Sequence, residues 1–69
     1  MSCAEYRKAI GARIRELRAV ADRTLPELSK LAGVSKGNLS KVEHGSNASI
    51  ETLCRLADAL GVPVKELLP

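Results

Sequence analysis

The connection between two short helical segments, at residues 33–35, limits the folds open to this chain more than any other feature of its sequence. Residues 25–32 and 36–43 each carry a helical apolar pattern, and only Gly33-Val34-Ser35 joins them. A turn of this length that contains glycine makes two short helices cross at a steep angle, about 90–120°. The spacing therefore predicts a helix-turn-helix over about residues 25–43. Short helix pairs also occur in helical bundles that do not use them for binding.

Capping residues define these two helices and two further ones. In a capping box, Ser or Thr precedes a helix and Glu follows three residues later, so that each side chain bonds the backbone N–H of the other. The chain contains two such boxes and two further serine caps: Ser2 with Glu5, Thr24 with Glu27, Ser35, and Ser49. Pro26 falls in the first turn of its helix, where its missing N–H costs little. Gly33 and Gly61 are placed to end helices.

Apolar residues recur every three or four positions, and no stretch alternates with period two. This spacing is typical of amphipathic helices around one core. The expected helices cover about residues 3–22, 25–32, 36–43 and 50–60, with a last short one at 64–68. Their inner stripes contain Tyr6, Ile10, Ile14, Leu17 and Ala21 in the first helix and Ile50, Leu53, Cys54, Ala57 and Leu60 in the fourth. The sequence predicts an all-α fold, a compact five-helix bundle forming a single domain over residues 1–69.

The predicted helix at residues 36–43 has a thin apolar face. Leu39 and Val42 mark its inward side, and the opposite side contains small or hydrogen-bonding residues: Lys36, Gly37, Asn38, Ser40, Lys41 and His44. In a helix-turn-helix protein the second helix lies in the major groove of DNA. Lysine can donate to O6 and N7 of guanine, asparagine can pair with adenine, and glycine admits a close approach of the backbone. The alternative interpretation is a solvated helix face with a chance glycine.

The net charge of +3 is unevenly distributed along the chain. Residues 1–41 contain nine Lys and Arg and four acids, a net +5, whereas residues 42–69 contain two and four, a net −2. A basic region of this kind favours a polyanionic partner. The alternative is that the six arginines lie on solvated helices and need no partner.

The residue types of catalytic and metal sites are scarce. One His and two Cys do not form a zinc-binding pattern, so we expect reduced cysteines, a cytoplasmic chain, and neither metal nor cofactor. Paired acids, a nucleophile arrangement and a glycine-rich phosphate loop are missing, so no enzyme is predicted. Tyr6 is the only aromatic residue, which disfavours single-stranded nucleic acids, whose bases stack on aromatic rings. No apolar run reaches the roughly 20 residues of a membrane span, and charges interrupt the N-terminus as they would not in a signal peptide.

Residues 10–68 resemble the Cro/repressor-type helix-turn-helix domain of the Xre family, which is lambda-repressor-like in fold. The resemblance is carried by four segments: "IRELR" at 14–18, "LSKLAGVS" at 28–35, "LSKVEHG" at 39–45 and "LADALGV" at 56–62. With "SNASIETL" after the third helix, the chain is also similar to the small controller proteins of restriction–modification systems and to small phage and plasmid repressors. These relatives imply a DNA-binding fold.

The resemblance implies roles for particular residues. Those that match DNA-contacting positions are Thr24, Ser35, Lys36, Gly37, Asn38, Ser40, Lys41, His44 and Asn47. Arg18 and Glu43 match an ion pair that ties the first helix to the third. The chain departs from the family at Leu25, where a phosphate-binding Gln is usual, so that only the amides of the second helix remain for phosphate. Gly37 is the other departure, because it lacks an expected base-reading side chain.

The family binds inverted repeats as a two-fold dimer, with half-sites ~34 Å apart. The candidate dimer surface combines the outer face of the fourth helix with Val62, Val64, Leu67 and Leu68. The alternative is that these residues fold back onto the first helix.

The predicted function is sequence-specific binding of double-stranded DNA by a homodimeric transcriptional regulator, without a small-molecule effector. The alternative is a protein-interaction module on the same fold, such as an antitoxin or a coactivator-type domain.

Overall fold

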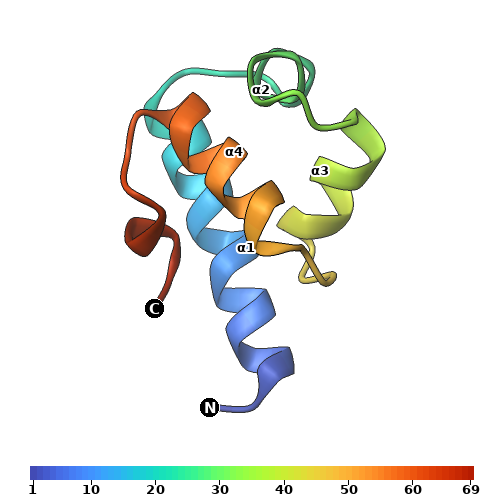
Figure 1. Cartoon of the computed structure of the whole chain (residues 1–69), viewed down its shortest axis with the longest axis vertical. Coiled ribbons are helices and arrows are strands. Elements are labelled where there is room, and N and C mark those ends of the chain that lie inside the picture. Colours follow the sequence, from blue (N-terminus) through green and yellow to red (C-terminus); the bar gives the residue numbers. More distant parts are fainter.

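The computed structural model describes residues 1–69 and contains four α-helices (Figure 1). They are α1 (Cys3–Val20), α2 (Leu25–Ala32), α3 (Lys36–Glu43) and α4 (Ile50–Leu60), followed by a 3-10 turn, η1 (Val64–Leu67). The all-α class is as predicted, but the fifth helix is not. The N–H of Glu66 bonds the carbonyl of Pro63, and that of Leu68 bonds Lys65, which is the tighter i to i+3 pattern. The segment after Pro63 is therefore a single tight turn and not an α-helix.

The predicted caps form at the starts of all four α-helices. Both capping boxes are reciprocal, and Ser35 and Ser49 each accept a bond from the N–H three residues on, at 3.1 Å. Gly33 and Gly61 end α2 and α4 in the left-handed conformation, with φ of 68° and 73°. Helix α1 stops at Val20, two residues earlier than predicted, because Asp22 has a φ of +55°, which no helix accommodates.

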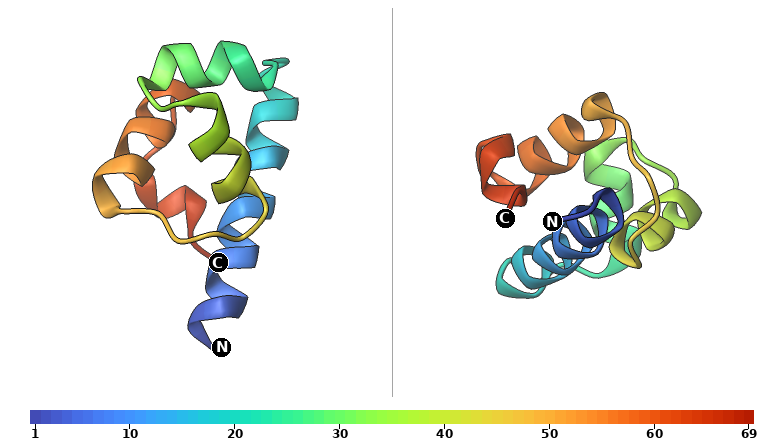
Figure 2. Two further views of the ribbon diagram at one scale, coloured as in Figure 1. Left: turned by 90° about the vertical axis from the view of Figure 1, so that its right-hand side faces the viewer. Right: turned by 90° about the horizontal axis from the view of Figure 1, so that it is seen from below.

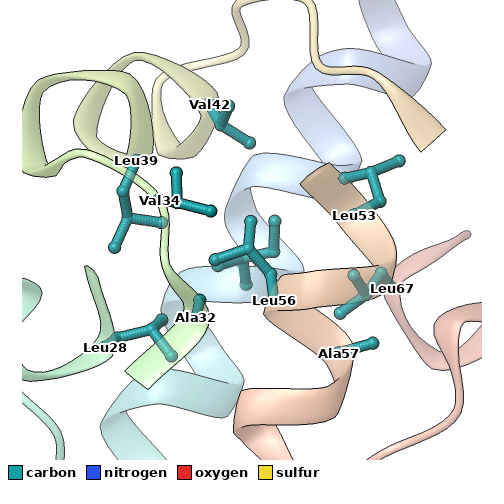
Figure 3. Packing of buried hydrophobic residues seen from close by; sticks show 10 residues of the cluster. Leu28, Ala32, Val34, Leu39, Val42, Leu53, Leu56, Ala57 and Leu67 are labelled. Atoms are coloured by element: carbon teal, nitrogen blue, oxygen red, sulfur yellow. The ribbon is translucent and has the colours of Figure 1, made fainter. Parts of the chain in front are cut away.

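Ten buried apolar residues form one core between the helices (Figure 3). They are Ile14, Leu28, Ala32, Val34, Leu39, Val42, Leu53, Leu56, Ala57 and Leu67. Helix α1 packs on α3, and α2 packs on both α3 and α4. The core thus takes residues from every helix and from the turn between α2 and α3.

Three residues expected on inner stripes are exposed, and the first of them, Ala21, lies just beyond the end of α1. Tyr6 is 45% exposed because the first turns of α1 project beyond the rest of the molecule (Figure 2). Ile50 is 73% exposed because it is the first residue of α4 and lies at the edge of the packing. Helical periodicity therefore extended both stripes past the point where a neighbouring element covers them.

The C-terminal apolar residues divide between core and surface. Leu67 is completely buried and packs in the core, so its assignment to a dimer surface is wrong: a side chain without exposed area cannot meet a second copy. Val62 is half-buried, whereas Val64 and Leu68 remain exposed. The fold-back alternative therefore holds for Leu67, and the dimer surface stays a prediction for Val64 and Leu68. None of the helices is both long and apolar enough to cross a membrane.

Candidate nucleic-acid interface

The turn between α2 and α3 is fixed from within the helix pair. Val34 is buried, its N–H donates to the carbonyl of Ser29 at 3.1 Å, and its own carbonyl accepts a bond from the Ser29 hydroxyl. Gly33 supplies the left-handed residue that the turn requires. The turn at residues 33–35 and the side chain of Ser29 therefore fix the direction of α3 relative to α2.

An ion pair holds the end of α3 against α1. Arg18 donates from Nε to Glu43 Oε2 at 2.8 Å and from Nη2 to Oε1 at 3.0 Å, and its Nη1 bonds the carbonyl of Arg23. Glu43 is only 3% exposed. The hydrogen bonds to Glu43 raise the pKa of Arg18 above its ordinary value, although burial opposes them. Arg18 is thus committed to the fold, as the resemblance implied, and is not available to DNA.

Helix α1 also approaches α3 through a glycine. A Cβ on Gly11 would lie 2.5 Å from the carbonyl oxygen of Val42 and 2.7 Å from that of Glu43. Backbone atoms cannot move aside as a flexible side chain can, so no larger residue fits without a shift of α3. The sequence marks Gly11 only as a weak helix position, and its packing role becomes visible in the structure.

The outward side of α3 is polar and basic. Lys36, Gly37, Asn38, Lys41 and His44 are exposed, and Ser40 is half-buried. Neither lysine takes part in an ion pair, and the helix's one acid is the buried Glu43. An approaching phosphate therefore meets cations and no exposed carboxylate on this helix.

Gly37 differs from Gly11 in its surroundings. A Cβ built there would meet no atom within 4 Å. The fold itself therefore does not require glycine at this position.

Several predicted contact residues already have partners within the chain. The Ser35 hydroxyl accepts from the N–H of Asn38 and keeps its own hydrogen. His44 Nδ1 lies 2.7 Å from the carbonyl of Ser40, which can only accept, so Nδ1 carries the hydrogen and Nε2 remains exposed. Asn47 is exposed in the loop that follows α3. These three side chains keep a group for an external partner.

The start of α2 is less open than predicted. The N–H of Thr24 bonds Glu27 Oε1 at 2.8 Å, the N–H of Glu27 bonds the Thr24 hydroxyl, and Pro26 has no N–H. Only the amide of Leu25 remains, beside a carboxylate that repels phosphate. The expectation that the α2 amides form a phosphate site is therefore not supported, and Thr24 acts first as a cap.

A contact between α1 and the loop after α3 was missed from the sequence. Arg7 Nε donates to the carbonyl of Gly45 at 3.3 Å, and Gly45 has a φ of +94°. The side chain of Lys8 lies against the same glycine. Arg7 and Gly45 are 38 residues apart in the sequence, so no local pattern predicts their contact.

Two helices joined by a tight turn, with the second presenting a basic, polar face, define this chain as a helix-turn-helix protein. The sequence profile of a family described as a helix-turn-helix domain matches residues 9–68, and the chain belongs to this family.

Relatives of known description agree with this family. The chain is 37% identical over 59 residues to an HTH-type transcriptional regulatory protein of Methanocella arvoryzae, covering 86% of this chain but only 18% of that protein. Its fold is similar to the restriction-modification controller protein C.AhdI from Aeromonas hydrophila, with 32% identity, a TM-score of 0.86, and coverage of 88% and 94% of the two chains. It is also similar to SinR, a master regulator for biofilm formation solved in complex with DNA, with 38% identity, a TM-score of 0.80 and coverage of 84% and 95%.

Proposed function

We propose that this chain is a transcriptional regulator that binds double-stranded DNA at specific sequences, with α3 in the major groove. The observation that carries the proposal is the outward side of α3, which is exposed, basic and free of carboxylates while its inner side is locked by Glu43 and Gly11. A helix that reads bases must be held rigidly on one side and be unoccupied on the other. The related regulators, one of them solved with DNA, support this assignment.

Each outward side chain has a role that fits its chemistry. Lys36 and Lys41 donate to guanine edges or to flanking phosphates, and Asn38 reads adenine or holds a phosphate. Gly37 lets the helix backbone approach the groove. The remaining proposed contacts come from hydroxyl, amide and imidazole groups at the edges of α3 and α2: Thr24, Ser35, Ser40, His44 and Asn47.

Two copies would bind an inverted repeat. One chain of this size covers few base pairs, and a two-fold dimer doubles the sequence read by placing two α3 helices in successive turns of the major groove. Occupancy of the operator would then depend on protein concentration. A role on DNA agrees with the expected cytoplasmic location.

Selection from a pool of random DNA duplexes tests the proposal and identifies the operator in the same experiment. Repeated capture and amplification should converge on one sequence with two inverted half-sites. Binding of that sequence, followed by fluorescence anisotropy, should survive unrelated competitor DNA and weaken steeply as salt rises, because phosphate contacts release counterions.

Two results would overturn it. A pool that never converges, or binding that unrelated DNA removes completely, would mean that α3 does not read sequence. Weight would then move to the protein-interaction alternative on the same fold.

A further inference from the structure

Two cations of α1, Arg7 and Lys8, lie beside the loop that follows α3 (Figure 2). They precede the part of the chain that the family profile matches, which begins at residue 9. Arg7 Nε donates to the carbonyl of Gly45 at 3.3 Å, and a Cβ on Gly45 would lie 3.1 Å from Cγ of Lys8. Both side chains are therefore held next to the C-terminal end of α3.

The bond to Gly45 orients the guanidinium group of Arg7. This group is planar and rigid, and its five N–H donors form a fixed fork. Once Nε is bonded to the carbonyl, the edge formed by Nη1 and Nη2 has no partner within the chain. That edge presents two parallel N–H groups, the arrangement that binds two oxygens of one phosphate.

No carboxylate of the chain neutralises these two cations. Neither Arg7 nor Lys8 belongs to an ion pair. Glu5, the nearest acid along α1, directs its Oε1 to the N–H of Ser2. Glu43, at the end of α3, is buried and paired with another arginine. An anion from outside the chain is therefore the partner open to both side chains.

The same part of the surface contains other groups proposed to contact DNA. Arg7 lines one groove together with Ser46 and Asn47. The N–H of Ser46 bonds the carbonyl of Lys41 at 2.9 Å, which folds the loop back against the last turn of α3. Lys41, His44 and Asn47 are exposed there. A DNA backbone that passes this end of α3 would therefore also meet the two cations of α1.

We propose that Arg7 binds one phosphate of the DNA backbone through two N–H groups and that Lys8 binds the neighbouring phosphate. This inference rests on the proposed function and adds a contact from α1 that the resemblance did not imply. Every base pair carries the same phosphates, so the contact does not distinguish sequences. Its role is to fix the position of α3 along the groove.

The contact is largely formed before DNA arrives. Ordering a long, mobile side chain at an interface lowers affinity, and a side chain already held in its bound conformation avoids much of that cost. The bond to Gly45 holds Arg7, and the stem of Lys8 lies against the same glycine. The two cations therefore suit a contact that positions a neighbouring helix.

The salt dependence of DNA binding tests this proposal, using Arg7→Gln and Lys8→Gln against Lys65→Gln. Each variant removes one positive charge, and Lys65 is exposed on η1, which packs against α1 and α4. The logarithm of the binding constant falls with the logarithm of the salt concentration by about 0.9 for each phosphate neutralised. This slope should become shallower by about 0.9 in Arg7→Gln and in Lys8→Gln, and should stay unchanged in Lys65→Gln.

Affinity and base preference provide a second readout. Arg7→Gln should bind the selected duplex about tenfold more weakly at low salt, because a charge-assisted pair of hydrogen bonds is lost. It should keep the same preference at every base pair. Arg7→Lys should keep the slope of the wild type, since the charge remains, but should bind more weakly because an ammonium group has no rigid fork.

A purely structural role for Arg7 predicts a different pattern. If Arg7 only supported the loop, Arg7→Gln would lower affinity by the same factor at every salt concentration and leave the slope unchanged. Lys8→Gln, at an exposed side chain, provides an independent test if Arg7→Gln fails to fold, as urea denaturation would reveal. Unchanged slopes in both variants, or an equal change in Lys65→Gln, would overturn the proposal.

These outcomes are separable from the fate of the proposed function, because the slope can be measured on any duplex. A chain that selects one sequence but keeps its slope in Arg7→Gln and Lys8→Gln remains a regulator without this contact. A chain that binds all duplexes alike, with shallower slopes in both variants, has the phosphate contact and is not a sequence-specific regulator.

Discussion

Helices α3 and α4 both begin at a serine cap and both contribute to the core, yet they are held in the molecule by different means. Helix α4 has eleven residues and buries the apolar stripe of Leu53, Leu56 and Ala57. Helix α3 has eight residues and buries only two apolar side chains, Leu39 and Val42, together with Glu43. The shorter helix thus replaces part of an apolar stripe with one charged contact and one close backbone contact.

The difference shows in the ion pairs of the two helices. The pair between Glu43 and Arg18 joins α3 to α1 in a nearly buried site, whereas that between Glu51 and Arg55 spans one turn of α4 on the surface. Because the first pair is buried, breaking it should strongly destabilise the fold. The second pair is exposed to solvent and screened by salt, so it contributes little to stability. Because Glu43 at the C-terminal end holds α3 in place, the side chains on the outward side of the helix are not needed for folding.

The largest expected effect comes from removing the α3 anchor. Glu43→Ala should lower the free energy of unfolding by about 3 kcal/mol, the lower end for buried pairs, because Arg18 keeps some contact with solvent. Glu51→Ala, the same change in α4, should cost less than about 0.5 kcal/mol. Urea denaturation followed by circular dichroism measures both. Similar losses in the two variants would remove the distinction between the helices.

A second prediction compares the two helical glycines. Gly11→Ala should destabilise the fold by about 2 kcal/mol, because the new methyl group meets the carbonyls at the end of α3. Gly37→Ala should stabilise it by about 0.5–1 kcal/mol, since alanine is the better helix former and the space is open. The same measurement should give opposite signs, and Gly37→Ala should still weaken DNA binding. A stabilised variant with unchanged DNA affinity would mean that no groove approaches this position.

The third prediction concerns binding alone. Lys41→Ala should reduce affinity for the selected duplex about tenfold and relax the preference at one base pair, while leaving the unfolding free energy unchanged. Lys65→Ala, at another exposed lysine on η1, should change affinity little. Anisotropy titrations against the selected duplex and its single-base variants decide between them. Equal losses would point to general charge attraction in place of base reading.

The smallest effect concerns the caps, which differ between the helices because only α1 and α2 carry a glutamate in theirs. Hydrogen bonds from the backbone and hydroxyl of Thr24 lower the pKa of Glu27 below its ordinary 4.5. A carboxylate with a lowered pKa stabilises the fold above the pKa of its unfolded state, and this contribution is lost as pH falls through the folded value. Urea denaturation from about pH 6 to about pH 3 should therefore show a slightly shallower decline for Glu27→Gln than for the wild type. An identical decline would show that the cap adds nothing that depends on charge.

What the sequence predicts well here is local. Caps, the left-handed glycines and the three-residue turn depend on neighbours within a few positions, and all of them form as predicted. The contacts of Gly11 and Arg7 connect residues far apart in the chain, and no pattern in either segment specifies the partner. The pair of Arg18 and Glu43 was expected only because relatives have it.

The sequence pattern also failed to predict which residues are buried at the ends of the helices. Periodicity identifies the inner side of a helix but not how far its neighbours extend, so Tyr6 and Ile50 were assigned to the interior and proved exposed. The prediction for Leu67 was wrong in the opposite direction, since it was expected at the surface and is buried. One 3-10 turn places Leu67 in the core and leaves Leu68 exposed.

The placement of every α3 anchor on the inner side has a consequence for divergence among descendants of this chain. Substitutions at positions 36, 37, 38 and 41 touch neither the core nor the ion pair, so they should have little effect on whether the chain folds. If α3 reads DNA as proposed, duplicated copies of the chain would acquire different operators one residue at a time, with each intermediate still folded. Under that proposal, binding preference and folding depend on different residues of the same eight-residue helix.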